Sequence, residues 1–275
     1  MNISGLWVNK NNNKDDNLRQ GISALEFEIF RLAETNTDWR VVEKDSRLYA
    51  NTRGWWETTH ISFAHNCTNP PRGKHQWGGM ALLSINKAAH RVSDKGIDES
   101  SLGCWCWTHY RGRNNHILYL VCTYRPNVPT DPLSVYSQQR STLLEREDER
   151  CPRMAFFQDL GKFLNTALQQ GEHIILLMDG NTNMKRSDLH GSLGAFGLKE
   201  AVLSRHGIAG PETFHRNKTR TPIDGIWVSQ SLVIECSGYL DYDSVILGVD
   251  HCCLWIDLSF TAAFGHNMPS QDTKP

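Results

Sequence analysis

The sequence lacks any run of about 20 consecutive apolar residues, the length that a membrane-spanning helix needs. Its N-terminal stretch MNISGLWVNKNNNKDD also lacks a basic segment followed by an apolar one, which is the pattern of a secretory signal. Both absences argue against a membrane protein or a secreted one. We therefore expect an intracellular protein, nuclear or cytoplasmic, with no membrane partner.

The sequence also has no excess of either charge, since 29 Lys and Arg residues stand against 30 Asp and Glu residues. Any attraction to phosphate must therefore come from a local patch. Eight cysteines are present, but neither Cys104 and Cys106 nor Cys252 and Cys253 are followed by the second Cys or His pair that a zinc site requires. We expect core thiols rather than structural zinc or a disulfide framework.

Strand and helix patterns alternate along the 275 residues without an internal repeat or a long linker, which predicts a single α/β domain. Strong apolar alternation or continuous apolar runs predict strands, and RGRNN at 111–115 predicts a hairpin between two of them. Apolar residues at helical spacing, ended by Gly171, predict a core helix over 153–171, and a shorter one is expected over 18–25. The strands are expected over 27–36, 61–67, 77–85, 102–110, 116–127, 172–184, 220–229 and 252–258.

Polar side chains recur where these apolar strands begin or end. A single such acid usually caps a turn, and that is the ordinary interpretation of Asp250 beside His251 in LGVDHCCLWIDL. Several acids at strand ends, accompanied by amide, phenol and imidazole groups, instead indicate a site built on the rim of a sheet. The residues in question are Glu34, Tyr124, Asn127, Asp179, Asn181, Asp224, Asp250 and His251.

Seven short motifs, in this order, resemble those of the endonuclease/exonuclease/phosphatase superfamily, which includes pancreatic deoxyribonuclease. They are MNISGL, AETNTDW, GGMALL, TYRPN, MDGNTNM, TPIDGIWVS and VDHCCLWIDL. The resemblance implies a four-layer α/β sandwich in which two mostly antiparallel sheets pack face to face between helices. It covers 1–258 as one catalytic domain and leaves 259–275 as a tail or as a linker to a downstream region.

The resemblance also implies the roles of the site residues. Glu34, Asn2 and Asp250 would lie at an essential divalent metal, Mg²⁺ or Mn²⁺, both of which favour oxygen ligands. Asp179 would orient or deprotonate the attacking water, and Asn181 and Tyr124 would contact the phosphate. His251, oriented by Asp224, would stabilise the charge that develops on the phosphate. The implied reaction is in-line hydrolysis of a phosphodiester, leaving a 5′-phosphate and a 3′-hydroxyl if the substrate is DNA.

The chain departs from the superfamily pattern at several positions. Ala33 replaces the usual Gln, Val249 replaces a Ser, and Gly180 replaces an aromatic residue, which predicts a looser loop. Ser4 stands where abasic-site endonucleases carry an Asp. The superfamily also places a whole strand before the residue matching Asn2, so we expect the chain to lack most of its first strand.

Three functions remain open. The combination of ETNTDW, TYRPN and the ending after 258 resembles the endonuclease regions of non-LTR retroelements, so a DNA-nicking enzyme linked to a reverse transcriptase domain is favoured. A phosphatase or phosphodiesterase for inositol phosphates or lipids is the alternative, and a non-catalytic relic is the third. Asn127 and three basic residues would bind substrate, although a solvated charged loop explains the basic residues equally well. The basic residues are Arg216, Lys218 and Arg220.

Overall fold

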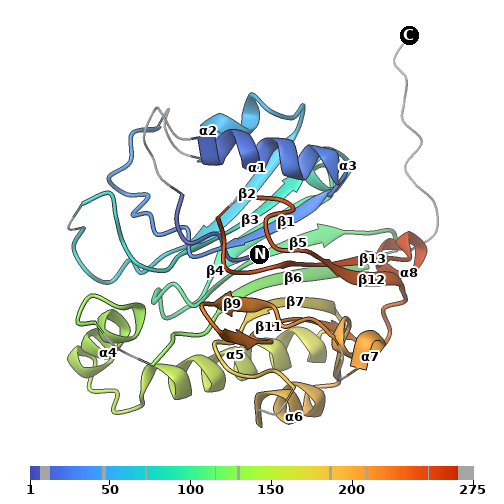
Figure 1. The fold of residues 1–275 in the computed structure, drawn as a ribbon. Helices are drawn as coiled ribbons and strands as arrows, with labels where there is room; N and C mark the ends of the chain where they lie inside the picture. Colours follow the sequence, from blue (N-terminus) through green and yellow to red (C-terminus); the bar gives the residue numbers. More distant parts are fainter. Residues whose placement is uncertain are drawn as a thin grey trace.

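The computed structural model describes residues 1–6, 13–44, 48–71, 73–114, 116–128, 131–185, 188–207, 210–246 and 248–265. Figure 1 shows two layers of strands lying between helices above and below. Three separate groups of buried apolar side chains fill the spaces between successive layers. This arrangement confirms the predicted four-layer α/β sandwich.

One layer is a six-stranded sheet whose strands carry Tyr124, Asp179 and Asp224. In spatial order it contains β4 (Val92–Ile97), β5 (Trp105–Arg111), β6 (Ile117–Tyr124), β7 (His173–Asp179), β11 (Asp224–Ser229) and β8 (Leu198–Glu200). Only β6 and β7 run parallel, and every other neighbouring pair is antiparallel. The predicted hairpin between β5 and β6 is confirmed.

The second layer packs on one face of that sheet. It contains the three-stranded sheet β1 (Ile29–Ala33), β3 (Met80–Ile85), β2 (Thr59–Ala64) and the pair β12 (Ile234–Leu240) and β13 (Cys253–Leu258). The edge of β1 away from β3 carries a single parallel bridge, from Ala33 to Asn2. A cavity of about 750 Å³ lies beside this edge and is also lined by β6, β7, β11 and β13.

Helices cover the two outer faces. Figure 1 shows α1 (Asn13–Ala24) and α2 (Leu48–Arg53) over the smaller sheet, and α5 (Pro152–Gln169) and α6 (Asp188–Ala195) beyond the six-stranded one. The remaining helices are α3 (Asn86–Ala89), α4 (Val135–Glu145), α7 (Leu203–His206) and α8 (Phe260–Phe264), and a small hairpin joins β9 (Phe214–Arg216) to β10 (Thr219–Thr221). No helix among the described residues is both long enough and apolar enough to cross a bilayer.

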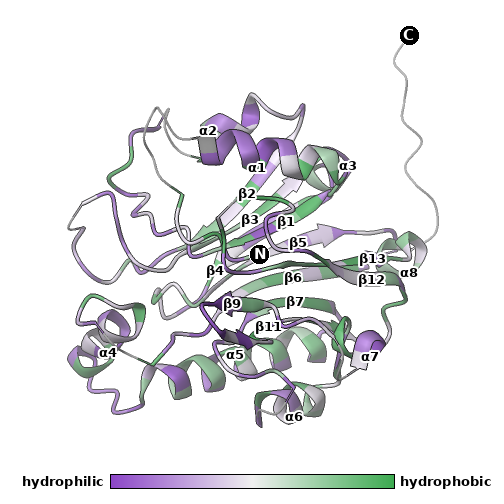
Figure 2. Ribbon diagram, viewed as in Figure 1, coloured by the Kyte–Doolittle hydropathy of each residue, from purple (hydrophilic) through white to green (hydrophobic). Residues whose placement is uncertain are grey.

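The apolar strands read as continuous runs because both of their faces are buried. Leu82 of β3 packs between the two sheets, whereas its neighbour Leu83 packs against the α1 side. In the same way Leu120 and Val121 of β6 belong to cores on opposite faces. Figure 2 accordingly shows mostly apolar strands in the middle of the molecule and more hydrophilic helices outside.

Several predicted strands were too long, because the local backbone geometry delays the start of a strand, ends it early or interrupts it. The strand over 77–85 begins only at Met80, since Gly78 and Gly79 adopt φ values of 92° and 81°. The strand over 172–184 ends at Asp179, and the strand over 220–229 is broken at Pro222 between β10 and β11. The predicted helix over 153–171 corresponds to α5, and all eight cysteines are free thiols.

Candidate active site

Three neighbouring strands in the middle of the six-stranded sheet place three functional side chains in one row at their ends. Tyr124 at the end of β6 is in register with Asp179 at the end of β7, and Asp179 is in register with Asp224 at the start of β11. All three are buried. Adjacent strands lie about 4.8 Å apart, so this register alone brings the phenol and the two carboxylates together.

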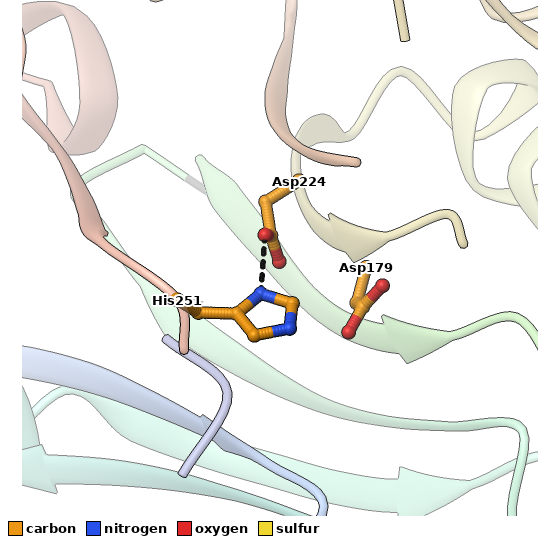
Figure 3. Close-up of side chains that lie close together, drawn as sticks. All are labelled: Asp179, Asp224 and His251. Carbon is orange, nitrogen blue, oxygen red and sulfur yellow. Dashed lines mark hydrogen bonds and ion pairs between the residues drawn. The ribbon is translucent and has the colours of Figure 1, made fainter. Parts of the chain in front are cut away.

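His251 reaches the same place from the segment that precedes β13. This segment pairs with β9, because His215 N–H donates to Asp250 O and Phe214 forms an antiparallel bridge with His251. The His251 ring, only 3 % exposed, bonds Asp224 Oδ2 through Nδ1 over 2.7 Å. Figure 3 shows the Asp179 carboxylate near the other side of the imidazole.

The position of Asp224 is fixed by a residue that the sequence analysis missed. Thr213 is fully buried, and its Oγ1 accepts hydrogen bonds of 2.9 Å from the backbone N–H groups of Ile223 and Asp224. These bonds anchor the first residues of β11 beneath the site. No local pattern marks this Thr, since its partners lie at least ten residues away in the chain.

Burial and mutual charge shift the ionisation of the buried acids and the histidine. Burial alone would lower the pKa of His251, but the adjacent Asp224 carboxylate raises it to about 9. Burial also opposes ionisation of Asp224, yet His251 and Arg31 hold its pKa below the usual value. Burial, with the nearby Asp224 charge, raises the pKa of Asp179 to about 6. Near neutral pH the site therefore pairs an imidazolium with Asp224 and leaves Asp179 as a weak base.

Glu34 and Asn2 reach these side chains from the layer that contains β1. Tyr124 Oη donates to Glu34 Oε1 over 2.8 Å, and burial together with Glu34 raises the phenol pKa well above its usual value, so the phenol stays protonated. Asn2 Nδ2 donates to Asp179 Oδ2 over 3.1 Å. Glu34 adopts a φ of 51°, an unusual conformation for a residue other than glycine.

Asp250 lies at the rim and is about one-third exposed, with Oδ1 3.9 Å from His251 Nε2. Ser4 Oγ donates to the same Oδ1 over 3.3 Å. Glu34 and Asp250 offer carboxylate oxygens and Asn2 offers an amide oxygen, which are the types of ligand that suit Mg²⁺ or Mn²⁺.

A second group of donors also merits consideration as a metal site. Within the described ranges, the one group of three acidic or imidazole residues whose donor atoms approach within 4.8 Å of one another is Asp179, Asp224 and His251. We favour the oxygen donors around Glu34, because His251 Nδ1 and Asp224 Oδ2 already bond each other and an imidazolium would repel a cation.

Asn181 is held by the loop that follows Tyr124. Its Nδ2 donates to Arg125 O over 2.8 Å, and its backbone N–H donates to Asp179 Oδ1 over 3.2 Å. Arg153 Nη1, from α5, donates to the carbonyls of Pro126 and Asn181 and so ties the two loops together. Asn181 also has a positive φ, of 44°.

The loop around Gly180 packs closely against Met184, and the expectation that it is looser than in the superfamily stays a prediction. A Cβ atom at Gly180 would lie only 2.8 Å from Met184 Sδ, and Met184 is fully buried. Met184 therefore occupies the space that an aromatic residue at position 180 would otherwise share.

The expected substrate-binding residues lie on the surface around the site. The hairpin of β9 and β10 exposes all three basic residues, Arg216, Lys218 and Arg220, and continues from Phe214, whose ring lies 5.1 Å from that of His251. Asn127 is exposed, and its Oδ1 accepts from the adjacent Val128 N–H rather than from another site residue. The structure thus brings together Asn2, Glu34, Tyr124, Asp179, Asn181, Asp224 and His251, with Asp250 at the rim and the other four outside.

Comparison with known proteins identifies the fold. No protein-family model matches the sequence, and no curated protein matches it. The 3′ phosphatase NExo from Neisseria, solved with a product DNA hairpin, superposes with a TM-score of 0.66 at 13% identity, over 94% of this chain and 97% of that one. The catalytic domain of Xenopus laevis APE2 gives 0.65 at 17% identity, over 94% and 90%.

The AP endonuclease LMAP from Leishmania major is similar to the same degree, with a TM-score of 0.65 at 14% identity over 93% of this chain and 85% of that one. The superpositions establish the fold, but sequence identities this low leave the substrate open. The chain therefore has the fold of the endonuclease/exonuclease/phosphatase superfamily, which is the fold that the resemblance of its motifs implied.

Proposed function

We propose that this protein is a divalent-metal-dependent phosphodiester hydrolase that nicks DNA. The observation that carries the proposal is the row of Tyr124, Asp179 and Asp224 on adjacent strands, completed by the 2.7 Å bond from Asp224 to His251. This row contains a weak base, a protonated phenol and an oriented imidazolium within one buried group. Hydrolysis of a phosphoester requires these elements at one point.

In the proposed reaction, Asp179 accepts a hydrogen bond from the attacking water and takes its proton. His251 donates from Nε2 to a phosphate oxygen and stabilises the charge that develops there, while Asp224 holds the ring by Nδ1. Asn181 donates a further hydrogen bond to the phosphate through its second amide hydrogen, and Tyr124 donates to the phosphate in place of its bond to Glu34 Oε1. In-line attack forms a bond from the water oxygen to phosphorus and breaks the bond from phosphorus to the 3′ oxygen, which takes up a proton from solvent. The products are therefore a 5′-phosphate and a 3′-hydroxyl.

Asn2, Glu34 and Asp250 would hold the metal, Mg²⁺ or Mn²⁺. When bound, a divalent cation there would neutralise phosphate charge and act as a Lewis acid. The fit rests on the donor set, because carboxylate and amide oxygens are the preferred ligands of these cations.

DNA is the proposed substrate because Arg216, Lys218 and Arg220 stand on an exposed hairpin whose first strand pairs with the His251 segment. Such a projecting basic hairpin suits the backbone of a long polyanion. The resemblance of the motifs to retroelement endonucleases supports a nicking role within a longer protein that carries a reverse transcriptase. The presence of all these site residues favours a catalyst over a relic.

The test is incubation of the purified protein with supercoiled plasmid and Mg²⁺, followed by identification of the end groups. We expect nicked circles with 3′-hydroxyl ends, no product in chelator and none from His251→Gln. The exposed Glu147→Gln serves as a control of wild-type rate. Phosphate release from a phosphoinositide without plasmid nicking would favour the alternative substrate class, and inactivity on both would overturn the proposal.

A further inference from the structure

Arg31 places a positive charge in the middle of an otherwise apolar strand, β1, with the sequence IFRLA. Its side chain is about 5% exposed. Removing a guanidinium from water is costly unless partners compensate, so a buried arginine in a core strand requires an explanation.

The Arg31 side chain crosses from one sheet to the other. Nη2 donates to Thr123 O of β6 over 2.9 Å, and Nη1 lies 3.5 Å from Asp224 Oδ1 at the start of β11. Both partners belong to the six-stranded sheet, whereas Arg31 belongs to the smaller one. The guanidinium is therefore an ionic link between the two sheets directly beside Asp224.

The two oxygens of the Asp224 carboxylate have different neighbours. Oδ2 bonds His251 Nδ1, whereas Oδ1 is buried without a hydrogen bond and faces Arg31 Nη1. The terminal torsion of an Asp side chain is soft, so a single bond to His251 does not fix the plane of the carboxylate. The Arg31 cation beside Oδ1 does fix this plane, because a rotation of the carboxylate that moves Oδ1 away from the guanidinium is disfavoured.

Charge balance leads to the same conclusion. Asp179 and Asp224 are buried side by side and repel each other, and His251 is one buried cation beside them. Arg31 and His251 together supply two cations against these two acids, while the Met1 amino group also acts on Asp224 and Glu34 also acts on Asp179. Without Arg31, the repulsion between the two carboxylates would be less well compensated.

We propose that Arg31 is a positioning residue for the reaction: it holds the Asp224 carboxylate from the side opposite His251, so that Oδ2 is presented to the imidazole. The inference rests on the proposed hydrolytic function only for its consequence on rate. Arg31 acts through Asp224 and is not itself a catalytic residue.

The first test compares Arg31→Met and Arg31→Lys with the wild type in the plasmid assay. A misplacement of about 1 Å can cost on the order of a hundredfold in rate, so we expect kcat to fall by roughly tenfold to a hundredfold in Arg31→Met, with KM little changed. Arg31→Lys keeps the charge and should recover part of the rate. Arg146→Met, on an exposed arginine, is the matched control.

The second test is a double-mutant cycle with Asp224→Asn. If Arg31 acts through Asp224, then Arg31→Met should have almost no further effect on kcat once the carboxylate is absent. A purely structural role predicts that the same loss persists in the Asp224→Asn background, and that result would overturn the proposal.

The third test needs no activity. The Nδ1 proton of His251, assigned by its loss in His251→Gln, should give a downfield proton NMR resonance that weakens or moves upfield in Arg31→Met and persists in Arg31→Lys and Arg146→Met. An unchanged resonance in Arg31→Met overturns the proposal, even if the protein hydrolyses neither substrate. If Arg31→Met does not fold, Arg31→Gln removes the charge while keeping a donor for Thr123 O, and the same outcomes apply.

Discussion

Replacing Asp179 by Asn is expected to stabilise the folded protein at pH 8 while abolishing hydrolysis. Asp179 is fully buried at the end of β7, and burial together with the Asp224 charge raises its pKa from 3.8 to about 6. The folded protein thus holds the Asp179 proton more tightly than the unfolded chain does. Ionisation of Asp179 therefore opposes folding, and the destabilisation grows as the pH rises from about 4 through 6.

The magnitude follows from the shift of about two pKa units, each equivalent to about 1.4 kcal/mol. At pH 8 the ionised carboxylate destabilises the fold by about 3 kcal/mol, and at pH 4.5 by about 1 kcal/mol. An Asn side chain removes this charge but leaves part of an amide without a partner, which costs about 1 kcal/mol at both pH values. The net gain is about 2 kcal/mol at pH 8 and close to zero at pH 4.5.

For a domain near this size, 1 kcal/mol corresponds to a change in melting temperature of about 2 to 4 °C. We therefore expect Asp179→Asn to melt about 4 to 8 °C above the wild type at pH 8, and at about the same temperature at pH 4.5. Melting should be followed in chelator, because a bound cation would favour the ionised acid. Asp241→Asn, on an exposed aspartate, controls for the loss of a surface charge.

An equal gain at both pH values, or a lower melting temperature at pH 8, would refute the electrostatic reasoning. The same protein samples should be assayed on plasmid with Mg²⁺. If Asp179→Asn nicks at the wild-type rate, Asp179 does not activate the water.

Three further predictions concern the metal site, the basic hairpin and the cavity. Glu34→Gln keeps an oxygen for the Tyr124 hydroxyl but removes a metal-binding carboxylate. The rate, measured over a range of Mg²⁺ concentrations, should fall by orders of magnitude with no change in melting temperature. An undiminished rate excludes Glu34 as a ligand. Replacing the three basic residues of the β9–β10 hairpin by Gln should make duplex binding less dependent on salt. The slope of log Kd against log salt should fall by about 0.9 for each DNA phosphate that the hairpin neutralises. An unchanged slope indicates a solvated loop. A designed apolar strand of about six residues fused before Met1 should raise the melting temperature, because it can pair with the open edge of β1 and fill part of the 750 Å³ cavity. A version of this strand that contains proline is the control. Equal melting temperatures of the two fusions would exclude this use of the cavity.

The sequence was sufficient to locate the site because the site lies where regular patterns are interrupted. An acid such as Asp179 or Asp224 next to a continuous apolar run is visible without any structure. Since both faces of these strands are buried, an acid is costly within them and is expected at their ends, and the ends of neighbouring strands meet on one side of a sheet. The resemblance of the surrounding motifs then implied phosphate chemistry.

The sequence could not provide the contacts that support the site. Arg31 meets Asp224 only because the two sheets pack face to face, and Thr213 reaches β11 only through the loop that precedes β9. The spatial order also places β11 between β7 and β8, out of chain order, so no local pattern predicts that Asp179 and Asp224 are neighbours. Such contacts depend on long-range register, which single-strand periodicity does not contain.

The residues that give the site its chemistry are also those that strain the fold. Glu34 and Asn181 adopt φ values of 51° and 44°, which cost on the order of 1 to 3 kcal/mol each for residues other than glycine. Asp179 adds the cost of a buried carboxylate beside Asp224. Arg31 opposes that last cost with a positive charge supplied from the other sheet. It follows that substitutions of Asp179 and of Arg31 should both slow hydrolysis but should change stability in opposite directions, because Asp179 supplies repulsion and Arg31 relieves it.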